Sequence, residues 1–209
     1  MIKSYCKLNL FLKVTKKLNN GLHNIQSNTV LINLYDKIII SPTSNKNDKV
    51  IFKGKFKKYI NKNNNSITQT LSILRKNKYI DNDKKFKIVV DKKIPTFSGL
   101  GGGTSNAAYL ISYFLKKKLK NKLLKLLEKK IGSDLRLFLF KSVVQKSLFK
   151  IEERKKNFKF FFILVLPKIK CSTKIIFSKV KKYSKKIKIK SNNFKSSKKY
   201  INFLKKERN

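Results

Sequence analysis

A glycine-rich segment contains the residue types best suited to chemistry. Four of the seven glycines fall within Gly99–Gly103, between Pro95 and Thr104-Ser105. Glycine lets the backbone approach a ligand closely, and a loop directly before a helix aims N–H groups and the positive dipole end at one point. The two hydroxyls could reach a phosphate oxygen or Mg²⁺. A merely flexible loop is the alternative, but a chain so poor in glycine rarely clusters four of them, so the segment predicts a phosphate site.

The elements around this segment indicate a mixed α and β domain. Strands are predicted at Leu8–Val14, Val30–Leu34, Lys37–Ile40, Val50–Phe52, Phe86–Val90 and Phe160–Leu166. Helical spacing of apolar residues predicts helices over Ser66–Lys76, after the glycines from Ala107 to Leu115, and from Leu123 onward. Strands precede helices without regular alternation, which favours an α+β class over a doubly wound sheet. From Lys179 the chain is rich in Lys, Ser and Asn, and this tail is either poorly packed or disordered.

The charge of the chain is extreme, at +43 for 53 basic and 10 acidic residues. Such a charge first suggests nucleic acid. The bases are nevertheless spread over the whole length, and only four are Arg, the residue best suited to bidentate contacts. Lys, Asn, Ile and Phe, which have AT-rich codons, are enriched together. Mutational bias therefore explains the charge better, and we expect no specific nucleic-acid partner.

Cysteine usage and hydropathy favour a cytoplasmic protein without a membrane partner. Cys6 and Cys171 lie far apart and have no metal-ligand spacing. Met1–Asn9 does not resemble a signal peptide, and the longest apolar runs fall far short of the roughly 20 residues of a membrane span. We expect a reducing compartment.

Several segments resemble the GHMP kinases in the right order. Pro-x-x-x-Gly-Leu-Gly-Gly-Gly-Thr-Ser-Asn-Ala-Ala, from Pro95, is similar to their phosphate-loop motif. The other matching segments are Cys6-Lys7-Leu8-Asn9-Leu10-Phe11-Leu12, Gly21-Leu22-His23 with Gln26, Gly132-Ser133-Asp134-Leu135-Arg136, and Ser172-Thr173 with Ile176-Phe177. The resemblance covers roughly residues 3–178, and ordered matches are more specific than one motif. Three consecutive glycines point to the branch whose acceptor alcohol carries a cytidine diphosphate group.

The resemblance implies a GHMP-kinase-like two-domain α+β fold, with an N-terminal ATP-binding domain at residues 1–150. Residues 151–209 would form a truncated or degenerate C-terminal domain. The implied reaction transfers phosphate from ATP, with Mg²⁺, to the 2-hydroxyl of a small-molecule substrate, cytidylyl-methylerythritol, in isoprenoid precursor biosynthesis. A monomer or weak homodimer is expected.

The resemblance also implies roles for individual residues. Asp134 would be the general base and Lys7 its partner, which steadies the alkoxide-like oxygen; capping a helix is the plainer role for Asp134. The implied substrate residues are Asn9, His23, Thr173 and Phe177, with Phe177 stacked on cytosine. The implied ATP residues are Pro95, Thr96, Phe97, Ser98, Gly99, Leu100, Gly101, Gly102, Gly103, Thr104 and Ser105, with Thr104 or Ser105 also on Mg²⁺. Asn65 would contact adenine, although capping the following helix explains it equally well.

The chain departs from the family pattern at several positions. Phe97-Ser98 stands where the family has Gly-Gly, Leu22 where it has a cytosine-stacking Tyr, and Arg136 where it has Pro. No glycine follows Gly132, so the family's late glycine-rich motif is missing. The rival hypotheses are a pseudokinase that folds without turnover, a basic nucleic-acid-binding protein, and a sister GHMP kinase acting on another alcohol.

Overall fold

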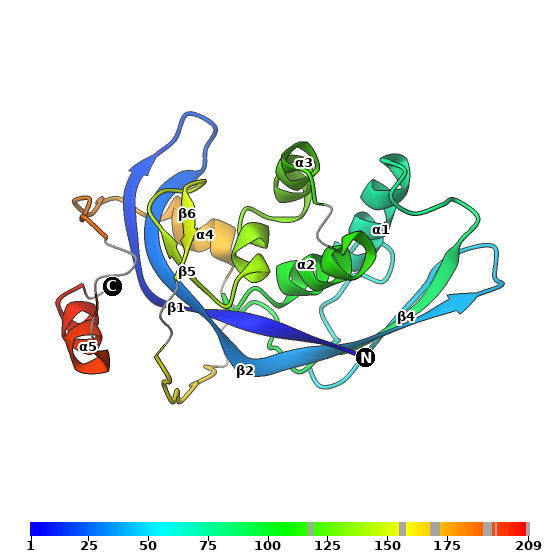
Figure 1. Ribbon diagram of the computed structural model, residues 1–209, viewed down its shortest axis with the longest axis horizontal. Helices are drawn as coiled ribbons and strands as arrows, with labels where there is room; N and C mark the ends of the chain where they lie inside the picture. Colours follow the sequence, from blue (N-terminus) through cyan, green and yellow to red (C-terminus); the bar gives the residue numbers. More distant parts are fainter. Residues whose placement is uncertain (117–118, 155–157, 168–171, 190–193, 195, 208–209) are drawn as a thin grey trace. The chain divides into compact units, whose positions relative to one another are not determined.

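In a computed structural model, the chain divides into two compact units (Figure 1). The structure describes residues 1–116, 119–154, 158–167, 172–189, 194 and 196–207. Unit 1 consists of Met1–Lys7, Ile32–Thr96 and Leu100–Leu139, and unit 2 of Leu8–Leu31, Phe97–Gly99 and Phe140–Asn209. The units are interleaved along the chain, and the division at residue 150 stays a prediction.

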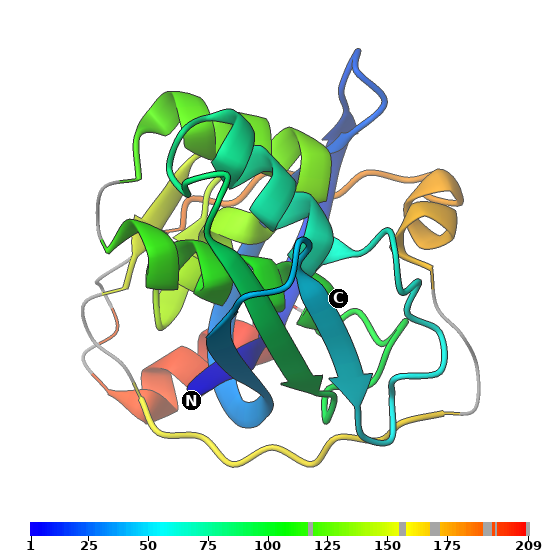
Figure 2. The same ribbon diagram turned by 90° about the vertical axis from the view of Figure 1, so that its right-hand side faces the viewer.

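The strands of unit 1 form a mixed sheet. The second half of β2 (His23–Thr43) pairs antiparallel with β4 (Lys85–Asp91), from Lys37 opposite Asp91 to Thr43 opposite Lys85. On the other side of β4, β3 (Lys49–Lys53) pairs in parallel, and Figure 2 shows the two strands side by side. A mixed sheet with helices agrees with the predicted α+β class.

Helix α1 (Ser66–Lys76) connects the two parallel strands and has the predicted bounds. Asn65 Oδ1 accepts hydrogen bonds from the N–H groups of Ile67 and Thr68, and Thr68 Oγ1 accepts one from the N–H of Asn65. This capping box satisfies N–H groups that have no partner within the helix. Ile67, Leu71 and Leu74 are buried at helical spacing, so the predicted helix and its cap are both confirmed.

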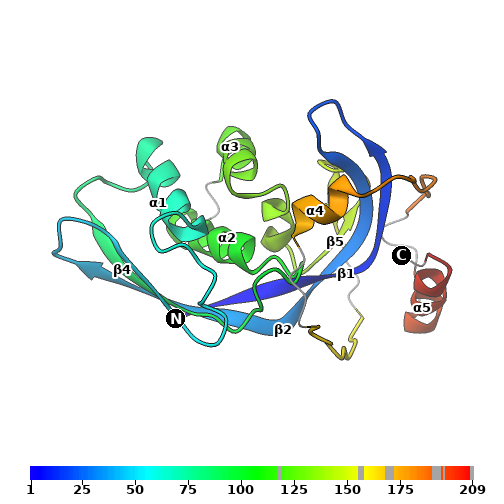
Figure 3. The ribbon, with the colours of Figure 1, turned by 180° about the vertical axis from the view of Figure 1, so that it is seen from behind.

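Three further helical segments complete unit 1. They are α2 (Gly102–Leu115), α3 (Asn121–Ile131) and the 3₁₀ helix η1 (Leu135–Leu139). Helix α2 packs against α1 and η1, and α3 packs against α1 and η1 as well. Figures 1 and 3 show α1 and α2 on the same side of β4. Their buried side chains, among them Leu71, Leu110, Ile111 and Leu127, supply the apolar burial that stabilises the packing of these helices.

Strand pairing in unit 2 begins with a hairpin between β1 (Ile2–Lys17) and β2. A turn joins the two strands: the Gly21 N–H donates to the Leu18 carbonyl, and Gly21 has a φ of 79°. The first half of β2 also pairs antiparallel with β5 (Ser142–Gln145), and β5 pairs antiparallel with β6 (Ile151–Glu153).

The C-terminal part of unit 2 contains α4 (Thr173–Ser178) and α5 (Ser197–Lys206). Phe203 and Leu204 of α5 pack on a buried cluster of Phe11, Val144 and Ile189. Tyr200 is fully buried. The described part of the basic tail therefore contributes a packed helix to the core of this unit.

The prediction of a buried strand at Phe160–Leu166 is wrong. The segment has no strand structure, and Phe161, Ile163 and Val165 are 103%, 94% and 84% exposed. A strand is stabilised by pairing and by a covered face. Among the described residues no strand pairs with this segment, so apolar composition alone does not bury it.

No helix in the described part of the chain is long and apolar enough to cross a membrane.

Candidate active site

The glycine-rich loop leads into α2 with the backbone geometry that its sequence predicts. Gly99 and Gly101 have φ values of 74° and 71°, in the left-handed region that glycine enters without strain. A Cβ on Gly101 would lie 2.7 Å from Phe138 Cζ and 3.4 Å from Lys7 Cε. Gly101 is also the N-cap of α2 and offers no side-chain hydrogen bond. The positive end of this helix is therefore bare of a capping side chain, as an anion site requires.

Phe97 adopts a conformation that suits glycine better. Its φ is 57°, and its side chain is 47% exposed. A left-handed conformation costs an ordinary residue about 1–2 kcal/mol. The position where the family pattern has glycine is thus one where the backbone favours glycine.

Lys7 and Asp134 form an ion pair within unit 1, which confirms the expected pairing. Lys7 Nζ lies 3.3 Å from Asp134 Oδ2; the lysine side chain is 6% exposed and the carboxylate 34%. The Lys7 N–H donates to the Leu100 carbonyl at 3.1 Å, so β1 is bonded to the glycine loop at the same residue. A buried ammonium thus faces a carboxylate that solvent, and a substrate, can reach.

The loop before η1 positions Asp134. The Leu135 N–H donates to the Gly132 carbonyl, and the Leu137 N–H to the Asp134 carbonyl. A Cβ on Gly132 would lie 3.1 Å from Thr104 Oγ1, so the hydroxyl of Thr104 lies against this loop. Arg136, the cation next to Asp134 in sequence, makes two 2.9 Å bonds to the Glu128 carboxylate. The Glu128 carboxylate, in α3, therefore offsets the charge of Arg136.

The two candidate hydroxyls at the start of α2 differ in their surroundings. Ser105 is fully buried; its Oγ donates to the Tyr5 carbonyl at 2.5 Å and is hydrogen-bonded to Ser4 Oγ at 2.7 Å. Thr104 is only partly buried. Of the two residues predicted for phosphate or Mg²⁺, Ser105 is therefore buried and hydrogen-bonded within the protein, whereas Thr104 is partly exposed.

The side chain of Asn65 is occupied by the cap of α1. Its Oδ1 accepts two hydrogen bonds, as described above, and its Nδ2 donates to the carbonyls of Asn61 and Lys62 at 3.0 and 3.1 Å. These four bonds use every position an amide offers. Capping thus accounts for Asn65 fully, and its contact with adenine stays a prediction. An open, polar hollow beside it is lined by Asn64, Thr68, Gln69 and Lys130, among others.

The predicted substrate residues lie in unit 2, where two of them meet. The rings of His23, at the start of β2, and Phe177, in α4, stack with centroids 5.3 Å apart and planes 26° apart. Asn9 Oδ1 instead accepts a hydrogen bond from Thr29 Oγ1, and Thr173 is the exposed first residue of α4.

Tyr183 joins this pair and was missed by sequence reasoning. Its ring centroid lies 6.4 Å from that of His23, at an interplanar angle of 32°. The Ser184 N–H donates to the Val14 carbonyl, and Gln26 makes two 2.9 Å bonds to the backbone of Ile187. These bonds hold the tyrosine segment beside β1 and β2. Tyr183 lies in a Lys-rich stretch without motif, so no local signal could have singled it out.

Comparison with known proteins shows which family the chain resembles. Residues 65–140, which run from Asn65 through the glycine loop to η1, match the N-terminal domain of the GHMP kinases. The 4-diphosphocytidyl-2-C-methyl-D-erythritol kinase of Pelagibacter ubique is 43% identical over 188 residues, which cover 88% of this chain and 66% of the relative. The chain belongs to the GHMP kinase family. The same-named protein of Wigglesworthia glossinidia brevipalpis is 36% identical, over 84% of this chain and 59% of the relative.

Solved GHMP kinase structures share the fold. A crystal structure of 4-(cytidine 5'-diphospho)-2C-methyl-D-erythritol kinase has a TM-score of 0.51 at 22% identity, covering 68% of this chain and 50% of the other. Methanococcus jannaschii mevalonate kinase has a TM-score of 0.52 at 21% identity, covering 74% and 55%. This GHMP kinase chain spans about two thirds or less of the length of the relatives it matches.

Proposed function

We propose that the chain transfers the γ-phosphoryl group of ATP to the 2-hydroxyl of 4-diphosphocytidyl-2-C-methyl-D-erythritol, a step of isoprenoid precursor biosynthesis. The observation that carries this proposal is the Lys7–Asp134 pair beside the glycine loop. The substrate is the one named in the relatives that resemble most of this chain.

Asp134 and Lys7 supply the acid–base chemistry. The Asp134 carboxylate accepts the proton of the substrate hydroxyl. The oxygen of that hydroxyl attacks the γ-phosphorus as the bond between this phosphorus and the ADP oxygen breaks. Lys7 stabilises the charge that develops on the attacking oxygen, because its ammonium is buried and already in place. Asp134 is accessible enough to meet a hydroxyl, and Lys7 has no need to move.

ATP is bound by the loop and the first turn of α2. The bare helix start attracts the phosphates, and Gly101 lets the backbone come close to them. Mg²⁺ prefers oxygen ligands and usually takes most of them from phosphates and water. The Thr104 hydroxyl beside the Gly132 loop suits that donor set, whereas Ser105 is committed to Tyr5 and Ser4. When bound, Mg²⁺ neutralises phosphate charge.

The cytidine part of the substrate is bound by unit 2. His23 and Phe177 offer partly exposed rings and Tyr183 an exposed one, and a pyrimidine stacks well on such flat surfaces. Asn9 and Thr173 are proposed to contact the rest of the substrate.

Turnover of ATP tests the proposal directly. The purified chain is assayed with Mg²⁺, with and without the cytidylyl substrate, beside Asp134→Asn and beside Asp81→Asn, which alters an exposed pair with Lys84. We expect substrate-dependent turnover that Asp134→Asn abolishes and Asp81→Asn leaves intact. A folded chain that binds ATP without turnover would instead be a pseudokinase. Turnover with another small alcohol alone would identify a sister kinase.

A further inference from the structure

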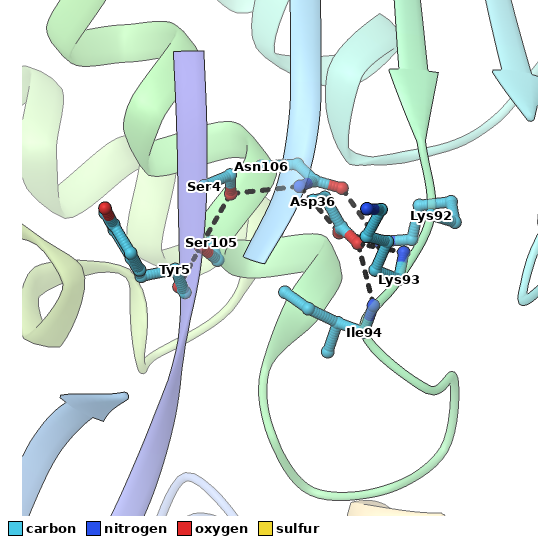
Figure 4. A network of polar contacts seen from close by, with 8 residues as sticks. All are labelled: Ser4, Tyr5, Asp36, Lys92, Lys93, Ile94, Ser105 and Asn106. Atoms are coloured by element: carbon cyan, nitrogen blue, oxygen red, sulfur yellow. Dashed lines mark hydrogen bonds and ion pairs between the residues drawn. The ribbon is translucent and has the colours of Figure 1, made fainter. Parts of the chain in front are cut away.

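Asp36, in β2, is a fully buried carboxylate that the proposed reaction does not use (Figure 4). It forms an ion pair with Lys92, which is 2% exposed and follows the end of β4. Taking two charges out of water is expensive, and such pairs seldom stabilise a fold more than apolar residues would. We therefore expect this buried ion pair to position the segments that it connects.

The contacts of Asp36 reach both ends of the glycine loop. Its Oδ1 accepts hydrogen bonds from the N–H groups of Lys93 and Ile94 at 2.8 and 2.9 Å, directly before the loop begins at Pro95. Its Oδ2 accepts a bond from Asn106 Nδ2 at 3.0 Å, and Asn106 lies in α2, which follows the loop. One carboxylate thus joins the segment that enters the loop to the helix that leaves it.

Lys92 and Asn106 close this arrangement. Lys92 Nζ contacts Asp36 Oδ2 and donates to Asn106 Oδ1 at 3.0 Å. A Cβ on Gly102 would lie 3.4 Å from Lys92 Nζ and 2.9 Å from Ile94 Cγ2, so the ammonium lies against the first turn of α2. Burial lowers the pKa of Lys92, opposed by the attraction of Asp36.

The network extends to the strand that carries Lys7. Asn106 Nδ2 also donates to Ser4 Oγ at 3.0 Å, Ser4 Oγ is bonded to Ser105 Oγ, and Ser105 Oγ donates to the Tyr5 carbonyl. Figure 4 shows these side chains as one continuous set of contacts. These bonds hold the start of α2 in a fixed position against strand β1.

We propose that Asp36 is a positioning residue for the phosphate loop: through Lys93, Ile94 and Asn106 it fixes the distance between the two ends of the loop, and so the aim of the first N–H groups of α2. Asp36 acts through these residues and does not itself contact the substrate. The proposal rests on the proposed function only in taking ATP as the ligand of the loop.

The amide variant Asp36→Asn tests the proposal. Its oxygen can still accept from Lys93 and Ile94, but its NH₂ then faces Asn106 Nδ2 and Lys92 Nζ, so donors oppose donors. We expect the Kd and KM for ATP to rise about tenfold or more, with little change in the KM for the alcohol. Hydrogen exchange across residues 95–104 should speed up in the same variant.

A swap of the two groups provides the rescue. In Asp36→Asn/Asn106→Asp the new amide oxygen still accepts from Lys93 and Ile94, its NH₂ donates to the carboxylate now at position 106, and Lys92 keeps an anion. We expect ATP affinity to recover most of its loss. Asn106→Ala removes the bonds of Asn106 to Asp36, Lys92 and Ser4 but leaves the two bonds that Asp36 accepts directly before the loop, and it should weaken ATP binding several-fold in a folded protein.

Asp48→Asn is the matched control. Like Asp36, Asp48 is an ion-paired carboxylate of unit 1, although it is only partly buried; it pairs with Arg75 and accepts the Phe86 N–H at 2.9 Å, and neither partner is in the loop. The Asp48→Asn variant should have a lower free energy of unfolding without a selective loss of affinity for ATP.

Four results would overturn the proposal. Three concern the variants: unchanged ATP affinity in folded Asp36→Asn, equal losses for ATP and alcohol, or a swap that rescues nothing. The fourth is absence of ATP binding by the unaltered chain. ATP affinity and hydrogen exchange are measured without turnover. The kinase reaction could therefore fail while the loop proposal holds, and the two failures remain distinct.

Discussion

Lys7 Nζ faces Asp134 Oδ2 at 3.3 Å, and the main chain of the same lysine is bonded to Leu100 of the glycine loop. One residue of β1 thus connects the proposed base with the proposed phosphate site. Lys7 is nearly buried while Asp134 is a third exposed, a division that suits a fixed charge and a group that must meet a hydroxyl.

Removal of the Lys7 charge should slow the chemical step. Lys7→Met keeps most of the length of the side chain but loses the ammonium that stabilises the attacking oxygen, and we expect kcat to fall about 10²–10³-fold. The KM for ATP should change little. Steady-state kinetics beside Lys84→Met, an exposed lysine, provide the comparison. Near-normal kcat in Lys7→Met would contradict the role.

Variants of Asn65 separate capping from adenine recognition. Asn65→Ala should lower the free energy of unfolding by about 1 kcal/mol, because α1 loses its cap. Asn65→Asp keeps the acceptor at the positive helix end but sets a carboxylate oxygen against the carbonyls of Asn61 and Lys62, so it too should lose some stability, with a KM for ATP close to normal. Thermal unfolding and kinetics check both values. A large rise in the KM for ATP in the folded Asp variant would show that the amide contacts the base.

Tyr183 should contribute to binding of the cytidylyl substrate. Tyr183→Leu removes one of the three rings of the cluster formed by His23, Phe177 and Tyr183, and an aromatic pair contributes about 0.5–1.5 kcal/mol beyond its area. We expect the KM for this substrate to rise about 2- to 10-fold, with the KM for ATP unchanged and Tyr183→Phe close to normal. Equal substrate affinity in all three proteins would leave Tyr183 without a role in binding.

Phe97 should tolerate glycine better than an ordinary position does. Phe97→Gly relieves about 1–2 kcal/mol of left-handed strain, which exceeds the 0.5–1 kcal/mol that glycine's freedom in the unfolded chain costs. Stability should therefore hold or rise slightly in urea unfolding. Phe149 is similarly exposed and has no positive φ, so Phe149→Gly should lose stability. Parallel losses in the two variants would argue against strain at Phe97.

Cys6 should be an unreactive thiol in the folded chain. Burial raises its pKa to about 12 from an ordinary 9.0, so the thiol stays protonated. Because the folded pKa is the higher one, this stabilising contribution is complete below pH 9 and is lost as the pH rises towards 12. In a Cys171→Ser background, a thiol reagent at pH 8 should modify Cys6 only on unfolding. Rapid modification of the native protein would refute the burial.

Local features of the chain were predictable because short-range physics decides them. The cap and bounds of α1 follow from Asn65 and the spacing of Ile67, Leu71 and Leu74, all within one helix. The positive φ values of Gly99 and Gly101 follow from residue type and neighbourhood. The pairing of Lys7 with Asp134 was anticipated through resemblance to a family, since nothing near Lys7 distinguishes it from the other lysines.

Prediction failed where partners distant in sequence decide the outcome. Phe160–Leu166 has the composition of a buried strand, yet burial needs a pairing strand and a covering face, and composition specifies neither. Tyr183 acquires its neighbours only because Gln26 and Val14 hold the backbone beside it.

The sequence by itself determined the glycine-rich loop, the helix that follows it and the family, because glycine conformations, caps and ordered motifs depend on consecutive residues. Only the tertiary structure decided that Asp36 is hydrogen-bonded at both ends of that loop, that the Ser105 hydroxyl donates to the Tyr5 carbonyl, and that Arg136 is paired with Glu128. A hydrogen bond or ion pair depends on distance and burial, and for residues far apart in the chain both are set by packing.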